Sequence, residues 1–254
     1  MKSSLCSVSI RSHRPEVAKV RTTQMTDRQI RYIVGGVSSP LLANVLLDEV
    51  DRELERRGHC FARYADDANV YVRSRRAGER VMALLRRLYG RLKLRVNEAK
   101  SAVAPAFGRK FLGYAFWQSR GGTVKRAVAA KPLVTFKQRV GELTRRSGGR
   151  SIPAVIDGLR PYLLGWKAYF GLSQTPRVWR RLEEWLRHRL RAIQLKHWKR
   201  GLTNYRELRA MGASRRIAQQ VAANSRRWWC NSGKLLNSIL TLAWFDRLGL
   251  PRLS

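Results

Sequence analysis

Acidic residues are scarce in this chain of 254 residues, which has 17 Asp and Glu against 52 Lys and Arg. The formal net charge of +35 is far beyond what solubility requires, so the expected partner is a polyanion. Hydrophobic residues make up 44% of the chain, which is enough to bury a core and argues against wholesale disorder. The composition predicts a folded protein that binds nucleic acid, and it favours an anionic membrane less.

Cysteine and long apolar runs are also lacking. Cys6, Cys60 and Cys230 lie far apart and form no C-x-x-C pair, which argues against a zinc knuckle or a disulfide framework. No apolar run approaches the length of a membrane span, and the amino terminus lacks the apolar core of a signal peptide. We expect no membrane partner and a cytoplasmic location in a bacterium, or an organellar one in a eukaryote.

The positive charge is concentrated toward the carboxyl end. Residues 1–34 carry a net +5, residues 35–120 a net +8 and residues 121–254 a net +22. The last segment also holds seven of the eight tryptophans. Cations interleaved with aromatic rings suit RNA, although for most of these rings the favoured interpretation is that they fill a helical core. The expected RNA contacts are exposed cations on or just after one helix: Arg187, Arg191, Lys196, Lys199 and Arg200.

Hydrophobic periodicity predicts an α+β region followed by an all-α region. Residues 1–34 show no sustained period. Helices are expected over residues 40–57 and 77–92, a hairpin around residues 64–67, and strands over 93–103, 110–117 and 123–130. From Pro132 onward the pattern is helical.

The run Tyr64-Ala65-Asp66-Asp67 places two adjacent carboxylates at the turn between two strand-like segments. The two charges repel each other, and strands disfavour Asp, so the arrangement needs compensation. A divalent cation would supply it, because Mg²⁺ sites use one or two carboxylates together with substrate phosphates. Asp66 and Asp67 are therefore candidate metal ligands for phosphoryl or nucleotidyl transfer.

Several blocks resemble the palm of group II intron-encoded reverse transcriptases. They are residues 35–44, 63–67, 97–101 and 111–114, in the family's order. Later stretches resemble the family's maturase-specific thumb: residues 159–170, 185–191, 228–232 and 244–251. The resemblance implies a partial palm over 35–120, an antiparallel sheet with helices, then a strand or linker over 121–131 and a helical thumb over 132–254. Residues 1–34 do not match.

The resemblance also implies roles for individual residues. Asp66 and Asp67 would bind the two catalytic Mg²⁺ ions of an RNA-directed DNA polymerase. Gly35, Gly36 and Lys100 would lie at the nucleotide and template. A further three residues would grip the primer end: Phe111, Leu112 and Gly113. The implied partners are group II intron RNA, bound for splicing and mobility, and the DNA target or cDNA.

Departures from the family pattern leave three hypotheses open. Fingers and an upstream metal-binding Asp are expected but missing, since Glu16 and Asp27 lack the aromatic, strand-like context of that Asp. We therefore expect an amino-terminally truncated chain that is inactive alone. The first is an active polymerase and maturase whose missing part is supplied by self-association, by another chain or by residues 1–34. The second is a non-catalytic RNA-binding remnant, and the third is an unrelated basic RNA-binding protein. The missing carboxylate favours the second for this chain alone.

Overall fold

The computed structural model describes residues 16–23, 39–145, 148–233 and 235–253. These residues form two compact units. The sheet unit comprises residues up to 109 together with 116–124, and the helical unit comprises residues 110–115 together with 125 onward. Gly35 and Gly36, the expected nucleotide contacts, lie outside the described residues.

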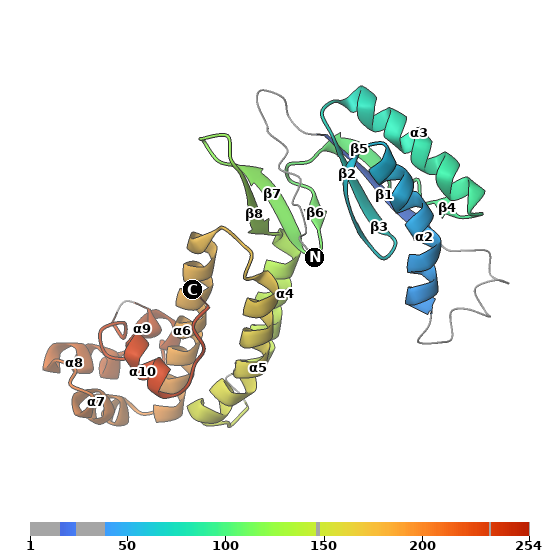
Figure 1. The fold of residues 1–254 in the computed structure, drawn as a ribbon. Coiled ribbons are helices and arrows are strands. Elements are labelled where there is room, and N and C mark those ends of the chain that lie inside the picture. Colours follow the sequence, from blue (N-terminus) through green and yellow to red (C-terminus); the bar gives the residue numbers. More distant parts are fainter. Residues whose placement is uncertain (1–15, 24–38, 146–147, 234, 254) are drawn as a thin grey trace. The chain divides into compact units, whose positions relative to one another are not determined.

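The sheet unit is built from short antiparallel strands and two helices (Figure 1). Its sheet has the strand order β2-β3-β1-β4, and β5 also pairs with β1. The elements are β1 (Glu16–Thr23), α2 (Ser39–Arg56), β2 (Cys60–Tyr64), β3 (Asp67–Val72), α3 (Arg75–Arg91), β4 (Arg95–Val96) and β5 (Ala102–Pro105).

Strand β1 was not expected from the sequence. It pairs antiparallel with β3 on one side and with β5 and β4 on the other, so it is an interior strand of the sheet. Its two valines, Val17 and Val20, are three residues apart, so the segment lacks the alternation that identifies a half-buried strand. The hydrogen bonds of its neighbours on both sides hold it in place.

Both helices of the sheet unit pack on the sheet through one apolar cluster. Helix α2 contributes Leu47, Val50 and Leu54, and Val70 from β3 lies against them. Helix α3 buries the stripe that its periodicity predicts: Val81, Leu84, Leu85 and Leu88. Ser74 caps the start of α3 by accepting a hydrogen bond from the Ala77 N–H at 3.3 Å. This packing fixes α2 close to the hairpin formed by β2 and β3.

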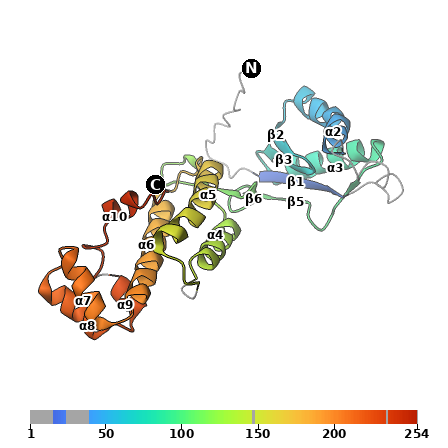
Figure 2. The ribbon, with the colours of Figure 1, turned by 90° about the horizontal axis from the view of Figure 1, so that it is seen from below.

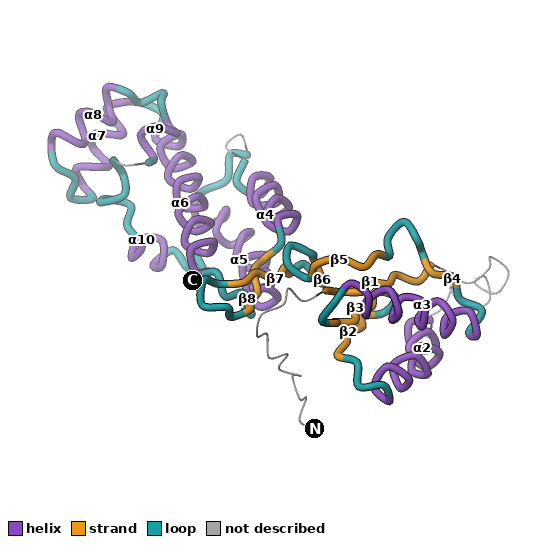
Figure 3. The backbone as a smooth tube through the Cα atoms, turned by 90° about the horizontal axis from the view of Figure 1, so that it is seen from above, coloured by secondary structure: helices purple, strands orange, loops and turns teal. Residues whose placement is uncertain are grey.

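A small three-stranded sheet of order β6-β7-β8 precedes helix α4 in the chain. From α4 onward the described regular elements are all helices (Figure 3). The elements are β6 (Lys110–Phe111), β7 (Tyr114–Gln118), β8 (Val124–Val128), α4 (Ala130–Leu143), α5 (Ile152–Phe170), α6 (Pro176–Trp198), α7 (Gly201–Ala210), α8 (Arg215–Ala223), α9 (Trp228–Ser232) and α10 (Leu242–Arg247). The predicted order, an α+β region and then an all-α region, is confirmed.

One core joins the helices of this unit. Helices α4, α5 and α6 surround aromatic residues such as Phe136, Trp166 and Trp179. The centre of the Trp166 ring lies 4.5 Å from that of Phe136 and 5.0 Å from that of Trp179. Helices α7 and α8 lie side by side as a hairpin after α6 (Figure 2). Most of the tryptophans therefore contribute to packing rather than to an exposed stacking surface; Trp229 is an exception at 44% exposure. Among the described residues, no helix is long and apolar enough to cross a membrane.

Candidate nucleic-acid and metal sites

The two adjacent carboxylates lie at the tip of the hairpin between β2 and β3. Tyr64 and Asp67 are Cα partners, so Ala65 and Asp66 form a two-residue turn, with Ala65 at a φ of 50°. Asp66 is exposed and Asp67 is half-buried. Asp67 leads directly into the buried residues Ala68 and Asn69. The hairpin predicted from the sequence is thus present, and its strands hold both carboxylates at one end of the sheet.

Arg63 fastens this hairpin to helix α2, a link that the sequence analysis did not identify. Its Nε and Nη2 donate to Asp51 at 2.8 and 2.6 Å, and its Nη1 donates to Asn44 Oδ1 at 2.8 Å and to Ala65 O at 3.3 Å. Both charged side chains are mostly covered, at 13% and 18% exposure. The hydrogen bond to Asp51 raises the pKa of Arg63. One guanidinium therefore connects the turn, its own strand and the adjacent helix.

Strand β1 brings no carboxylate to the turn. Its register opposite β3 pairs Arg21 with Asp67 and Glu16 with Val72. Glu16 is the only acidic residue of β1, and it lies at the end of the pairing farthest from the turn. The position facing Asp67 in the ladder is occupied by a basic residue type. The neighbouring strand thus adds a cation position where a metal site would require an oxygen ligand.

The donor set fits one divalent cation in part and does not complete a two-metal centre. Two adjacent carboxylates suit Mg²⁺ when substrate phosphates supply further oxygens. Among the described residues, no group of three or more His, Cys, Asp or Glu side chains could hold a metal. Lys100, the expected nucleotide contact, is exposed in the turn after β4, where its N–H donates to Asn97 Oδ1 at 3.2 Å. Its role at the site stays a prediction.

The expected primer-grip residues form the β6–β7 turn, and helix α5 holds that turn in place. Leu112 is 40% exposed at a φ of 50°, and its carbonyl accepts a hydrogen bond from the Tyr169 hydroxyl at 3.1 Å. The Tyr114 hydroxyl in turn donates to Tyr169 O at 2.5 Å. Gly113 has a φ of 78°, and a Cβ there would lie 3.0 Å from the Phe170 ring. Phe111 pairs with Tyr114 and is half-buried.

The structure separates the five cations that the sequence grouped as RNA contacts. Lys199 and Arg200 are exposed at the end of α6, in agreement with that prediction. Lys196 is half-buried, with its ammonium 5.6 Å from the centre of the Trp228 ring. Arg187 is half-buried and pairs with Glu183 at 3.3 Å. The expectation of exposure is therefore wrong for Arg187 and Lys196, which lie against neighbouring side chains.

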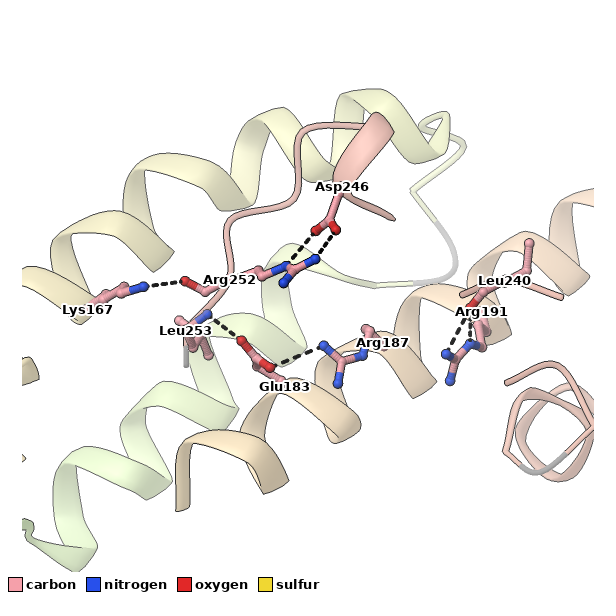
Figure 4. Close-up of polar contacts among 8 residues, drawn as sticks. All are labelled: Lys167, Glu183, Arg187, Arg191, Leu240, Asp246, Arg252 and Leu253. Atoms are coloured by element: carbon pink, nitrogen blue, oxygen red, sulfur yellow. Dashed lines mark hydrogen bonds and ion pairs between the residues drawn. The ribbon is translucent and has the colours of Figure 1, made fainter. Parts of the chain in front are cut away.

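Arg191 requires a larger correction, because this residue is only 6% exposed and lies in the interior of the helical unit. Its Nε and Nη2 donate to Leu240 O at 3.0 and 2.9 Å (Figure 4). Its Nη1 donates to Asn237 Oδ1. Burial, and secondarily the charge of Arg187, lowers the pKa of Arg191 to about 10. The guanidinium therefore stays charged at neutral pH and ties the segment before α10 to α6.

Glu183 continues the same attachment of the carboxyl-terminal segment. It accepts the Leu253 N–H at 2.5 Å and pairs with Arg187 (Figure 4). Lys167 donates to Arg252 O at 2.9 Å. Glu183 and Arg187 therefore pair their charges within the protein, and Arg191 donates its hydrogen bonds to two neutral oxygens there. Sequence spacing is compatible with the pair of Arg187 and Glu183, which are four residues apart. It could not show the contacts of Arg191 with Leu240 and of Glu183 with Leu253, because these partners lie 49 and 70 residues away along the chain.

Exposed cations are instead found on α7, α8 and the segment after them. Between residues 199 and 227 the chain has eight basic residues and one acidic residue. The exposed members that the sequence analysis did not single out are Arg206, Arg209, Arg215, Arg216, Arg226 and Arg227. Their excess over acids was visible in the sequence, but their exposure follows from which helix faces are buried.

Two family models match the chain. The model described as reverse transcriptase (RNA-dependent DNA polymerase) matches residues 17–116, and the model described as group II intron, maturase-specific domain matches residues 133–212. No curated protein shows a significant match. The first match includes most of β1, so the expected start of the resemblance at Gly35 is too late. The reason is that β1 is an integral strand of the sheet that carries the Asp66–Asp67 hairpin.

Proposed function

This chain belongs to the group II intron reverse transcriptases and maturases, and we propose that it binds structured intron RNA through its helical unit. The observation that carries the proposal is the exposed basic stretch over residues 199–227, with its single acidic residue. A solvated helical surface of this length ordinarily mixes both signs, whereas a phosphate backbone requires cations alone.

The salt dependence of RNA binding tests this proposal. Changing Arg206, Arg215, Arg216 and Arg226 to Gln should flatten the log–log salt slope by about 0.7–0.9 for each phosphate that no longer pairs with an arginine. A matched control changes four exposed arginines of α3 instead: Arg76, Arg80, Arg87 and Arg91. Equal slopes for both quadruple variants would show that the binding surface is not on α7 and α8. Filter binding of a structured intron RNA to the full chain supplies the measurement.

A second function is favoured by the hairpin, namely RNA-directed DNA synthesis at a metal-dependent site. The family is one of metal-dependent polymerases. We propose that Asp66 and Asp67 would hold Mg²⁺ together with substrate phosphates, and that Arg63 keeps the turn that carries them in place. When bound, the ion would neutralise phosphate charge and favour ionisation of the primer hydroxyl. Template RNA and the cDNA or DNA target are the proposed partners of this site.

The same site limits what one chain does by itself. The β1 position opposite Asp67 is occupied by Arg21 rather than by a carboxylate residue. We propose that the described residues leave a two-metal centre without one carboxylate ligand and that a second copy or another chain supplies it. Primer extension by the purified chain should therefore be undetectable. Extension that is lost in Asp67→Asn would show that this chain completes the centre from residues of its own.

A further inference from the structure

A groove in the helical unit lies between α6 and the segment that follows α9. Its volume is about 480 Å³, within the range of pockets that hold small-molecule groups. Helix α6 lines one wall with side chains on one face: Arg181, Trp185, His188 and Arg191. The opposite wall includes Asn237. The spacing of the α6 residues follows the helical repeat, so all four contribute to one continuous wall.

The groove is positively charged, and part of that charge is fixed and desolvated. Arg181 is exposed, Arg191 is buried, and Arg187 also lines the groove. The acceptors of Arg191 are the neutral oxygens of Leu240 and Asn237, so its charge is held in place without being neutralised by them. A guanidinium has five N–H donors, and the three hydrogen bonds to these oxygens leave others for an anion. Glu184 is the single carboxylate among the lining residues.

Aromatic surface lies directly beside these cations. The half-buried indole of Trp185 lines the groove, and the Arg189 guanidinium carbon lies 5.3 Å from its ring centre. The His188 ring stacks on Trp229, with centroids 3.8 Å apart and planes 22° from parallel. His188 Nε2 lies 2.8 Å from Trp229 O, so it is the protonated nitrogen, because a carbonyl can only accept. This contact fixes the imidazole as part of the wall.

We propose that the groove takes one unstacked nucleotide of RNA, with its phosphate at Arg181 and Arg191 and its base against Trp185 and His188. Protein sites for single-stranded RNA combine these two elements, a cation for the phosphate and a ring for the exposed base. The inference rests on RNA being the ligand of the helical unit. It adds that this unit prefers RNA with a bulged or looped-out nucleotide to a continuous duplex, which the exposed arginines of α7 and α8 do not distinguish.

The test compares two RNA hairpins that differ in one nucleotide. One carries a single-nucleotide uridine bulge and the other is fully paired, each with 5-iodouridine at the tested position. The full chain should bind the bulged hairpin about tenfold more tightly, in the range expected for stacking one base on an aromatic residue. Ultraviolet crosslinking followed by peptide mass spectrometry should place the bulged base on α6 at Trp185 or His188.

Two variants of exposed arginines on α6 make the comparison specific. Arg181→Gln should abolish most of the preference for the bulge, whereas Arg180→Gln, one residue away and outside the groove, should keep it. Equal affinity for both hairpins, or a crosslink outside α6 and residues 233–242, would overturn the groove proposal while leaving salt-dependent RNA binding intact. Failure to bind either hairpin would overturn both proposals.

Discussion

Arg191 shows how the fate of a single charge depends on partners far away in sequence. The run Arg187-His188-Arg189-Leu190-Arg191 has three arginines and a histidine among five residues, which predicts an exposed basic segment of a helix. In the structure Leu190 and Arg191 are both buried, because the segment before α10 crosses α6 there and Leu240 O needs a donor. Burying a carbonyl without a hydrogen bond is costly, so the guanidinium is a structural requirement at this position.

Removing that guanidinium should destabilise the helical unit. Arg191→Met would leave the carbonyl of Leu240 without its donor, at a cost of about 1–3 kcal/mol in the free energy of unfolding. Arg180→Met removes an exposed cation of the same helix and should change it by less than about 0.5 kcal/mol. Urea unfolding followed by tryptophan fluorescence measures both, since seven of the eight tryptophans lie in residues 121–254. Similar midpoints for the two variants would mean that Arg191 is not a structural tie.

The ion pair of Arg63 with Asp51 allows a second comparison at this scale. Asp51→Asn removes the charge that accepts from a mostly covered guanidinium, so it should destabilise the sheet unit by about 1–3 kcal/mol. Asp48→Asn breaks an exposed ion pair, in which Arg52 is 78% and Asp48 51% exposed. It should lower the free energy of unfolding by less than about 1 kcal/mol. Hydrogen exchange of the β2–β3 amides reports the effect. Equal protection in both variants would contradict a positioning role for Arg63.

At the scale of elements, the sequence predicted the helices and turns whose signal lies within a short stretch of the chain. Helices α2 and α3 and the hairpin at residues 64–67 were predicted, because each has its own periodicity or turn. The link between Arg63 and Asp51 of α2 could not be predicted, since Arg and Asp are ordinary surface residue types in the sequence. Strand β1 was not predicted either. Its stability comes from pairing with β3 and β5, and the sequence does not show which strands lie beside it in the sheet.

The β6–β7 turn gives an element-scale prediction. Gly113→Ala would force a side chain into a positive φ and place its Cβ 3.0 Å from the Phe170 ring and 3.4 Å from Pro132 Cγ. Gly212 has a φ of 85° with nothing within 4 Å, so Gly212→Ala carries the backbone strain alone. Gly113→Ala should lower the free energy of unfolding by about 1–3 kcal/mol more than Gly212→Ala. Urea unfolding measures the free energy of unfolding of both variants. Equal decreases would indicate that Phe170 of α5 moves aside without destabilising the protein.

At the scale of the whole molecule, the basic residues have two roles: some make hydrogen bonds inside the protein, and others are exposed to a partner. The helical unit holds most of the net positive charge, and the structure divides its cations between internal ties such as Arg191 and exposed arginines on α7 and α8. Net charge predicted the class of partner correctly, since family membership implies RNA. Net charge could not say which cations bind RNA, because tertiary packing decides their exposure.

The sheet unit allows a prediction about metal binding. Within the part of the chain that the structure describes, the proposed metal site formed by Asp66 and Asp67 lacks a third protein ligand, and a substitution on β1 should supply one. Wild-type protein should bind Mn²⁺ weakly, because among the described residues no third carboxylate joins Asp66 and Asp67 in a metal-binding group and substrate phosphates are absent. Arg21→Asp puts a carboxylate residue opposite Asp67 in the ladder, whereas Lys19→Asp puts one opposite Asn69, two residues farther from the turn. Outer-shell partners alone are worth about 10- to 100-fold in metal affinity, so a direct ligand should add at least about tenfold.

The measurement is the broadening of the Asp66 and Asp67 amide resonances in a Mn²⁺ titration, which reports proximity to the ion without any catalytic assay. Arg21→Asp should shift the titration midpoint to lower Mn²⁺ by at least about tenfold, and Lys19→Asp should shift it much less, since a carboxylate opposite Asn69 is too far along the strand to share the ion. Adding Asp66→Asn and Asp67→Asn to Arg21→Asp should abolish the broadening. If both β1 variants shift the midpoint alike, the gain reflects lower net charge rather than a completed site, and strand β1 does not occupy the place of the missing ligand.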